Sequence, residues 1–87
     1  MSLNQIARLG DSGSHGGSIS TASTVVYADG IGIARDQDTY SCAIHGDNPL
    51  ISGSNGVYVD GRLVIRVGDS ASCGAVINSG SEVVYSY

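Results

Sequence analysis

The chain has 87 residues, enough for one small domain, and we expect residues 1–87 to form a single domain. Its formal net charge is −4 and its basic residues are all Arg, which excludes nucleic-acid binding because that function needs a basic surface. A hydrophobic core of this size is marginal, so we expect a disulfide, a metal ion or a partner to stabilise the fold.

Short runs rich in Val and Ile alternate with Gly and Ser clusters along the chain. Such runs are typical of short β-strands, and no apolar pattern with the period of a helix extends over ten residues. We therefore expect an all-β fold with almost no helix. No apolar stretch is long enough to span a membrane, and the N-terminus lacks the basic and apolar segments of a signal peptide.

The middle of the chain contains an internal repeat. The residues Val-Tyr-Ala-Asp-Gly at 26–30 recur as Val-Tyr-Val-Asp-Gly at 57–61. Over the longer ranges 26–42 and 57–73, eight of seventeen positions are identical. Asp-Gly between two β-branched runs is a strong signal for a two-residue hairpin turn, because both turn positions need positive φ. We therefore expect two β-hairpins that turn at these Asp-Gly pairs.

A third copy of the repeat is divided between the two ends of the chain. Residues 6–15 match residues 64–73, and residues 81–85 match residues 23–27. We expect the C-terminal strand to pair with the N-terminal strand and so complete a third hairpin. The expected fold is a closed assembly of three pseudo-threefold β-hairpin repeats, closed by this terminal pairing, which also hides sheet edges.

Three of the four His and Cys residues occupy the same position of the repeat. His15, Cys42 and Cys73 each lie seven residues after an Arg, so the threefold arrangement should bring them together near its axis. His45 follows Cys42 in a Cys-x-x-His spacing, which can place both residues on one ion. Two thiolates and two imidazoles suit tetrahedral zinc, with iron as the less favoured metal. We therefore predict a structural metal site near this axis, formed by His15, Cys42, His45 and Cys73, whose metal contributes to folding.

Other interpretations of these residues stay open. The two cysteines could instead form a Cys42–Cys73 disulfide. A site filled by four protein ligands leaves no position for an activated water, so we expect no enzymatic activity. The alternatives are a small metallohydrolase, which would need an open coordination position, and a free-standing zinc-binding interaction module.

The remaining repeat residues suggest structural roles. Gly10 and Gly68 are expected to supply positive φ in tight turns, whereas Gln37 stands at this position in the middle repeat and leaves the geometry of that turn open. The Asp that follows is expected to accept backbone hydrogen bonds and to have no catalytic role. These carboxylates are Asp11, Asp38 and Asp69.

Three tyrosines also recur in the repeat, at Tyr27, Tyr58 and Tyr85. We expect them to pack against the base or flank of the sheet. Contact with a partner is the alternative role.

These residues resemble the PAAR-repeat family, which takes its name from a Pro-Ala-Ala-Arg motif. The counterparts, which all lack the leading Pro, are Gln5-Ile6-Ala7-Arg8, Gly32-Ile33-Ala34-Arg35 and Leu63-Val64-Ile65-Arg66. The family pattern is carried more clearly by Arg8-Leu9-Gly10-Asp11 with His15-Gly16-Gly17, by Cys42-Ala43-Ile44-His45-Gly46, and by Gly68-Asp69 with Ser72-Cys73-Gly74. The resemblance extends from Ile6 to Val84.

The resemblance implies a small β-cone with a metal near its point, held by His15, Cys42, His45 and Cys73. It implies a non-enzymatic, membrane-piercing tip that caps a trimeric β-helical spike, one copy per trimer. The spike would be VgrG-like, in a type VI secretion system, or the central spike of a contractile phage tail. Strand ends at the base of the cone are expected to continue the β-structure of the spike.

The same resemblance implies further partners and a location. An adaptor that attaches effector proteins to a secretion spike is the alternative function. Contact with a target membrane would be transient. The protein would be made in the cytoplasm, assembled on the spike and delivered to the target envelope without a signal peptide, or carried in a virion tail. No effector-sized extension is visible, so any toxin is expected to be a separate protein.

Overall fold

The structure, a computed structural model, describes residues 3–54 and 56–86, and these form short β-strands without any helix. The strands are β1 Asn4–Gln5, β2 Gly17–Ile19, β3 Tyr27–Ala28, β4 Ile31–Gly32, β5 Thr39–Cys42, β6 Gly46–Ile51, β7 Tyr58–Val59, β8 Arg62–Leu63, β9 Ser70–Ala71 and β10 Tyr85–Ser86. Gly, Ser and Asp-Gly interrupt each β-branched run after a few residues, which keeps the strands short. The all-β prediction is confirmed, and the described residues include no helix that could span a membrane. The expectation of a single domain stays a prediction.

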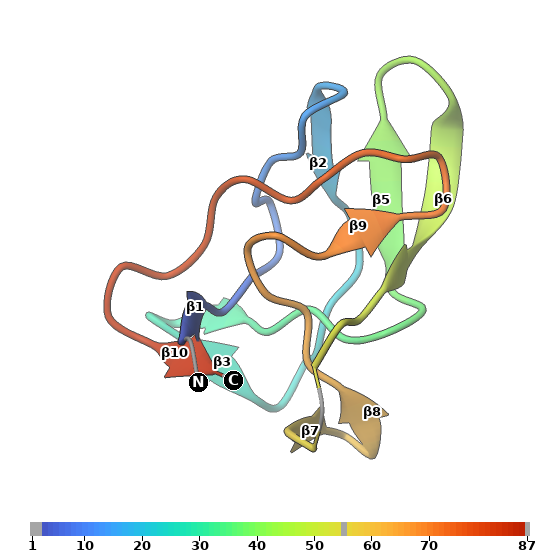
Figure 1. The fold of residues 1–87 in the computed structure, drawn as a ribbon. Helices are drawn as coiled ribbons and strands as arrows, with labels where there is room; N and C mark the ends of the chain where they lie inside the picture. The colour runs from blue at the N-terminus through green and yellow to red at the C-terminus, as the bar shows by residue number, and fades with distance from the viewer. Residues whose placement is uncertain (1–2, 55, 87) are drawn as a thin grey trace.

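Three two-stranded hairpins form the lower end of the molecule in Figure 1, beside both chain termini. The hairpins β3–β4 and β7–β8 turn through residues with positive φ, namely Asp29, Gly30, Asp60 and Gly61. In the third hairpin, β1 pairs with β10 through Asn4 opposite Ser86 and Gln5 opposite Tyr85. The three predicted hairpins and the pairing of the terminal strands are therefore confirmed.

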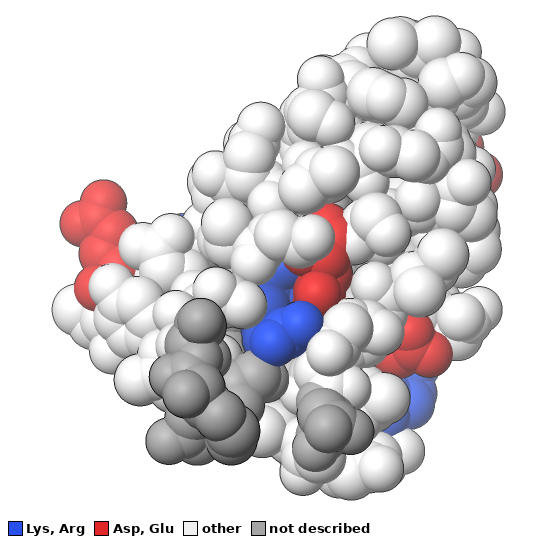
Figure 2. Space-filling model, viewed as in Figure 1, with Lys and Arg blue, Asp and Glu red and all other residues white. Residues whose placement is uncertain are grey.

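A four-stranded antiparallel sheet forms the other end, in the order β2-β5-β6-β9. An isolated bridge from Gly13, before β2, to Ile77, after β9, connects the two sides of this sheet and curls it. The turn between β5 and β6 is the uppermost point in Figure 1, far from the termini. Figure 2 shows that the molecule is broad at the base and narrower at this upper end.

A ring of backbone hydrogen bonds marks the approximate threefold axis. The amide of Ala7 donates to Ile65, that of Ile65 donates to Ala34, and that of Ala34 donates to Ala7, with N···O distances of 2.9, 3.0 and 3.0 Å. All three residues are fully buried. Each belongs to a different repeat, so the ring ties the three repeats together with their main chains alone.

Side chains from the three repeats stack in layers above this ring. Tyr40 is fully buried and takes the same repeat position as Gly13 and Ala71, whose small size leaves room for its ring. A second triad, Ile19, Leu50 and Ile77, is also buried in the same cluster. A separate cluster fills the base and consists of Ile6, Ala28, Ile33, Val59 and Val64.

The turn after each repeat Arg has the same conformation in all three repeats. Gly10 and Gly68 have φ of 86° and 99°, as predicted, and Gln37 adopts φ of 70°. The amide of Gln37 donates to Leu50, just as Gly10 donates to Ile19 and Gly68 donates to Ile77. The open question about the middle turn is therefore settled, because a non-glycine residue is held there in the left-handed region.

Each of these turns is also held by its arginine side chain, whose guanidinium donates hydrogen bonds to the aspartate three residues later. Asp38 accepts the backbone amide of Arg35 at 2.8 Å and both sides of its guanidinium at 2.8 and 2.9 Å. The prediction that the repeat aspartates accept backbone hydrogen bonds is thus confirmed. The guanidinium contact, which the sequence analysis did not foresee, also occurs in the pairs Arg8–Asp11 and Arg66–Asp69.

Candidate metal centre

The four His and Cys candidates lie at the ends of strands in the four-stranded sheet. Cys42 is the last residue of β5 and His45 directly precedes β6, so the turn between these strands holds both. His15 lies two residues before β2, and Cys73 lies two residues after β9. Their strands are neighbours in the sheet, so all four residues meet at the upper end in Figure 1.

The donor atoms of these four residues lie within 4.8 Å of one another and could hold a metal ion. Sγ of Cys42 is 3.7 Å from Nδ1 of His15 and 3.5 Å from Nδ1 of His45, and Sγ of Cys73 is 3.8 Å from Nδ1 of His15. A tetrahedral ion with ordinary bond lengths to nitrogen and sulfur would separate such donors by about 3.6 Å. The arrangement therefore fits a four-coordinate ion.

The surroundings of Cys42 favour its thiolate form. Burial raises the pKa of Cys42, but hydrogen bonds from the backbone amides of Ile44 and His45 and from the imidazoles of His45 and His15 lower it to about 6. The amide of His45 donates to Sγ at 3.4 Å. Thiolate is the form that ligates metals. Both cysteines are free, so the structure does not contain the alternative Cys42–Cys73 disulfide.

His45 comes from a longer loop in the middle repeat. Cys42 and Leu50 are separated by eight positions, whereas His15 to Ile19 and Cys73 to Ile77 are each separated by four. The extra residues form the β5–β6 turn and the start of β6, and they include His45. Three donors therefore occupy equivalent repeat positions, and the fourth is supplied by this insertion.

The comparisons with known proteins agree with this geometry. The family model of the PAAR motif matches residues 9–79, which include all four donor residues. The chain belongs to the PAAR family. A comparison with curated proteins found no match. The PAAR family comprises structural spike-tip proteins of secretion systems and phage tails, so the predicted resemblance is confirmed.

In this PAAR protein the side chain of Tyr40 packs beneath the donor cluster, in the same buried core as Cys42. Its hydroxyl donates to the backbone carbonyl of Gly16, next to His15. Burial raises the pKa of Tyr40, and the charges of Cys42 and Cys73 raise it further. Tyr40 was not predicted from the sequence because it has no tyrosine counterpart in the other repeats. The small residues at the equivalent positions could have indicated it.

A glycine allows the His15 loop of the PAAR fold to approach β5. A Cβ atom on Gly17 would lie 1.9 Å from the carbonyl oxygen of Ser41, and Gly17 has φ of 81°. Gly17 pairs directly with Cys42 in the sheet. This close approach places His15 beside Cys42, so a side chain at position 17 would separate two of the donors.

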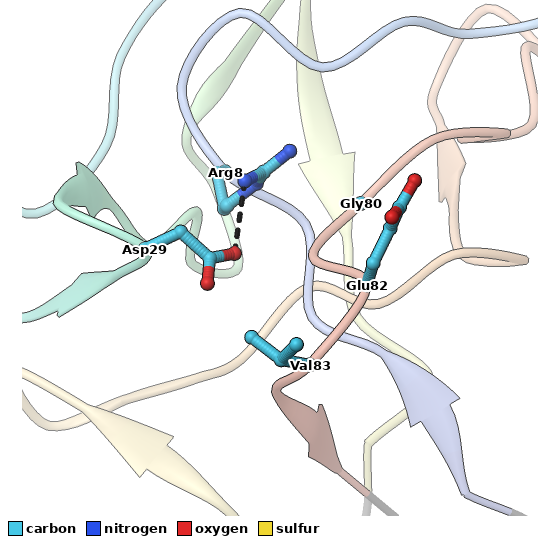
Figure 3. A pocket seen from close by; sticks show the side chains of 5 residues that line it. All are labelled: Arg8, Asp29, Gly80, Glu82 and Val83. Atoms are coloured by element: carbon cyan, nitrogen blue, oxygen red, sulfur yellow. Dashed lines mark hydrogen bonds and ion pairs between the residues drawn. The ribbon is translucent and has the colours of Figure 1, made fainter.

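Figure 3 shows a hollow of about 320 Å³ whose lining contains none of the four donor residues. It is lined by Arg8, Asp29, Gly80, Glu82 and Val83. Arg8 donates to Asp29 at 3.0 Å across one wall, and the hydrogen bond to Asp11 raises the pKa of Arg8. Because this guanidinium is already paired with two carboxylates, the hollow does not resemble an anion site.

Proposed function

We propose that this PAAR protein is a metal-stabilised, non-enzymatic tip that caps a trimeric β-helical spike, one copy per trimer. The proposed ligands are His15, Cys42, His45 and Cys73, and the proposed metal is zinc, which prefers this tetrahedral donor set. The observation that carries the proposal is the combination of two features on one axis. A backbone ring joins three similar repeats, and a four-donor cluster lies at one end of the molecule.

The symmetry supports capping of a trimer. Three similar hairpins at the base can each meet one subunit of a threefold spike in a similar way. The spike would be of the VgrG type or the central spike of a contractile phage tail, and the tip would contact a target membrane transiently. Native mass spectrometry of the chain mixed with a purified trimeric VgrG-type spike should give one copy per trimer. Three copies per trimer would rule out this capping geometry.

Four protein ligands support a structural role for the metal rather than a catalytic one. A closed coordination sphere has no position for substrate or water, so the bound metal would contribute folding energy. Elemental analysis of the purified chain should give one zinc per chain. After substitution with cobalt, the absorption spectrum should be that of a four-coordinate site with two thiolates. A spectrum that requires a bound water would instead favour the metallohydrolase.

Removal of the metal gives a direct test of its structural role. Zinc binding to small structural sites is worth about 10–16 kcal/mol, which exceeds the stability of a domain of this size. Addition of a chelator, or the substitution Cys73→Ser, should therefore abolish cooperative thermal unfolding monitored by circular dichroism. Ile44→Ala is the matched control, because it alters the same apical turn without removing a donor. Unchanged unfolding after chelation would refute the metal's role in folding.

A further inference from the structure

The base of the molecule exposes three tyrosine rings at equivalent repeat positions. Tyr27 begins β3, Tyr58 begins β7 and Tyr85 begins β10, and these residues are 56%, 63% and 48% exposed. These strands form the lower end in Figure 1, opposite the β5–β6 turn. About half of each tyrosine's surface is therefore open to solvent and available for contact with a partner, which was the alternative role expected from the sequence.

Aliphatic side chains accompany two of these rings. Val25 and Val83 lie two residues before Tyr27 and Tyr85, and both are largely exposed, at 70% and 73%. Each valine lies in the bend just before the strand of its tyrosine, so it adds exposed apolar surface close to the ring in the chain. Gly56 takes this position before the β7–β8 hairpin, so Tyr58 has no such valine beside it in the sequence.

Two of the rings are held in place by their own hydroxyl groups. The hydroxyl of Tyr27 donates to the carbonyl of Thr24 at 2.6 Å, and that of Tyr85 donates to the carbonyl of Glu82 at 3.3 Å. Each bond spans three residues within one outer strand segment. A ring that is already fixed loses little conformational freedom when a partner binds, which favours its use as an anchor.

Serine side chains cap backbone donors along the same outer segments. Oγ of Ser23 accepts the amides of Val25 and Val26 at 3.2 and 2.9 Å. Oγ of Ser81 accepts the amides of Val83 and Val84 at 3.1 and 2.9 Å. A strand added to either segment would have to break these bonds, because strand addition requires free backbone groups at the edge.

We propose that the base binds its trimeric partner through the rings of Tyr27, Tyr58 and Tyr85, and not by strand addition. This inference rests on the proposed function and names the contacts of that interface. Three exposed aromatic rings at equivalent repeat positions, two of them held by hydrogen bonds, fit a threefold partner whose subunits each offer an apolar contact. Exposed aromatic residues of this kind dominate the binding energy of many interfaces. The expectation that strand ends continue the spike is replaced by side-chain contact.

Binding measurements can test the three rings one at a time. The probe is a purified trimeric VgrG-type spike from the organism that makes this chain, titrated with the zinc-loaded protein. Tyr27→Ala and Tyr85→Ala should each weaken binding at least about tenfold, and Tyr58→Ala should have a smaller effect. The combined variant should show no detectable binding. Val76→Ala is the matched control, because it removes an exposed apolar side chain outside the base.

The results separate this inference from the proposed function. If the wild-type chain does not bind the trimer, the proposed capping function fails. If it binds and the tyrosine variants bind equally well, capping stands and the aromatic interface is refuted. The double variant Ser23→Ala, Ser81→Ala frees edge donors, so tighter binding by this variant would support strand addition and contradict our proposal.

A second measurement needs no variant and so does not depend on variant folding. Nitration by tetranitromethane should modify Tyr27, Tyr58 and Tyr85 in the free protein, because their rings are exposed. In the complex with the trimeric spike these three residues should be protected severalfold. The fully buried Tyr40 should stay unmodified in both samples and serves as an internal control. Equal nitration in the free and bound states would overturn the proposal.

Discussion

Replacement of Gln37 by Gly should stabilise the protein. Gln37 is exposed, has φ of 70° and makes its turn contact with the backbone amide, which donates to Leu50 at 2.9 Å. A glycine keeps that hydrogen bond. It also removes the steric cost of holding a residue with a Cβ atom in the left-handed backbone region, which is about 1–2 kcal/mol. Glycine also raises the entropy of the unfolded chain by about 0.5–1 kcal/mol. The net gain should be about 0.5–1 kcal/mol, which raises the melting temperature by about 3–6 °C.

The reverse change in another repeat provides the matched comparison. Gly10 has φ of 86°, and a Cβ atom placed there meets no atom within 4 Å, so Gly10→Ala should destabilise by strain alone. Gln37→Ala keeps the Cβ and should change stability little. All variants should be melted at the same saturating zinc concentration, because bound metal shifts the melting temperature. If Gln37→Gly does not stabilise while Gly10→Ala costs nothing, the conformational argument is wrong.

Two other substitutions test the packing and charges around the turns. Burial raises the pKa of Asp38, but hydrogen bonds from Arg35 and Thr21 outweigh it and hold the pKa below its ordinary value. This stabilisation is present at neutral pH and is lost as the pH falls through the lowered pKa, so Asp38→Asn should cost about 3 kcal/mol at neutral pH. Urea unfolding should show that the difference from wild type shrinks in acid; a constant difference would contradict this assignment. Gly13→Ala would place a Cβ 2.6 Å from the Tyr40 hydroxyl and should cost about 1–3 kcal/mol in the same assay, and an unchanged urea midpoint would show that Tyr40 can move.

The repeat made most of the fold predictable from the sequence. Two Asp-Gly pairs fix two hairpins by their φ requirement, and the divided third copy predicted that β1 pairs with β10. The ring of amides between Ala7, Ala34 and Ile65 was not predictable in the same way. It is made by main-chain atoms, which every residue carries, so no side-chain pattern specifies it.

The clustering of the four donor residues was predictable from the sequence, but the side-chain contacts that support this cluster and the turns below it were not. Equal repeat positions predicted that His15, Cys42 and Cys73 converge, because symmetry-related residues near an axis must lie close together. The buried Tyr40 was not predicted, because the other two repeats carry no tyrosine at its position and the repeat pattern therefore gave no signal for it. The Arg-x-x-Asp spacing was visible in all three repeats, but its guanidinium fork depends on side-chain rotamers that spacing does not determine.

The two departures from threefold symmetry have one geometric cause. Close to a threefold axis there is room for only one large side chain, so Tyr40 is opposed by Gly13 and Ala71. A tetrahedral ion on the same axis needs four donors, whereas three repeats supply only three equivalent positions. The insertion in the middle repeat resolves this mismatch, because it brings His45 back within reach of Cys42. Both departures lie toward the tip, where a tetrahedral ion would need four donors, whereas the base keeps three similar hairpins for a threefold partner.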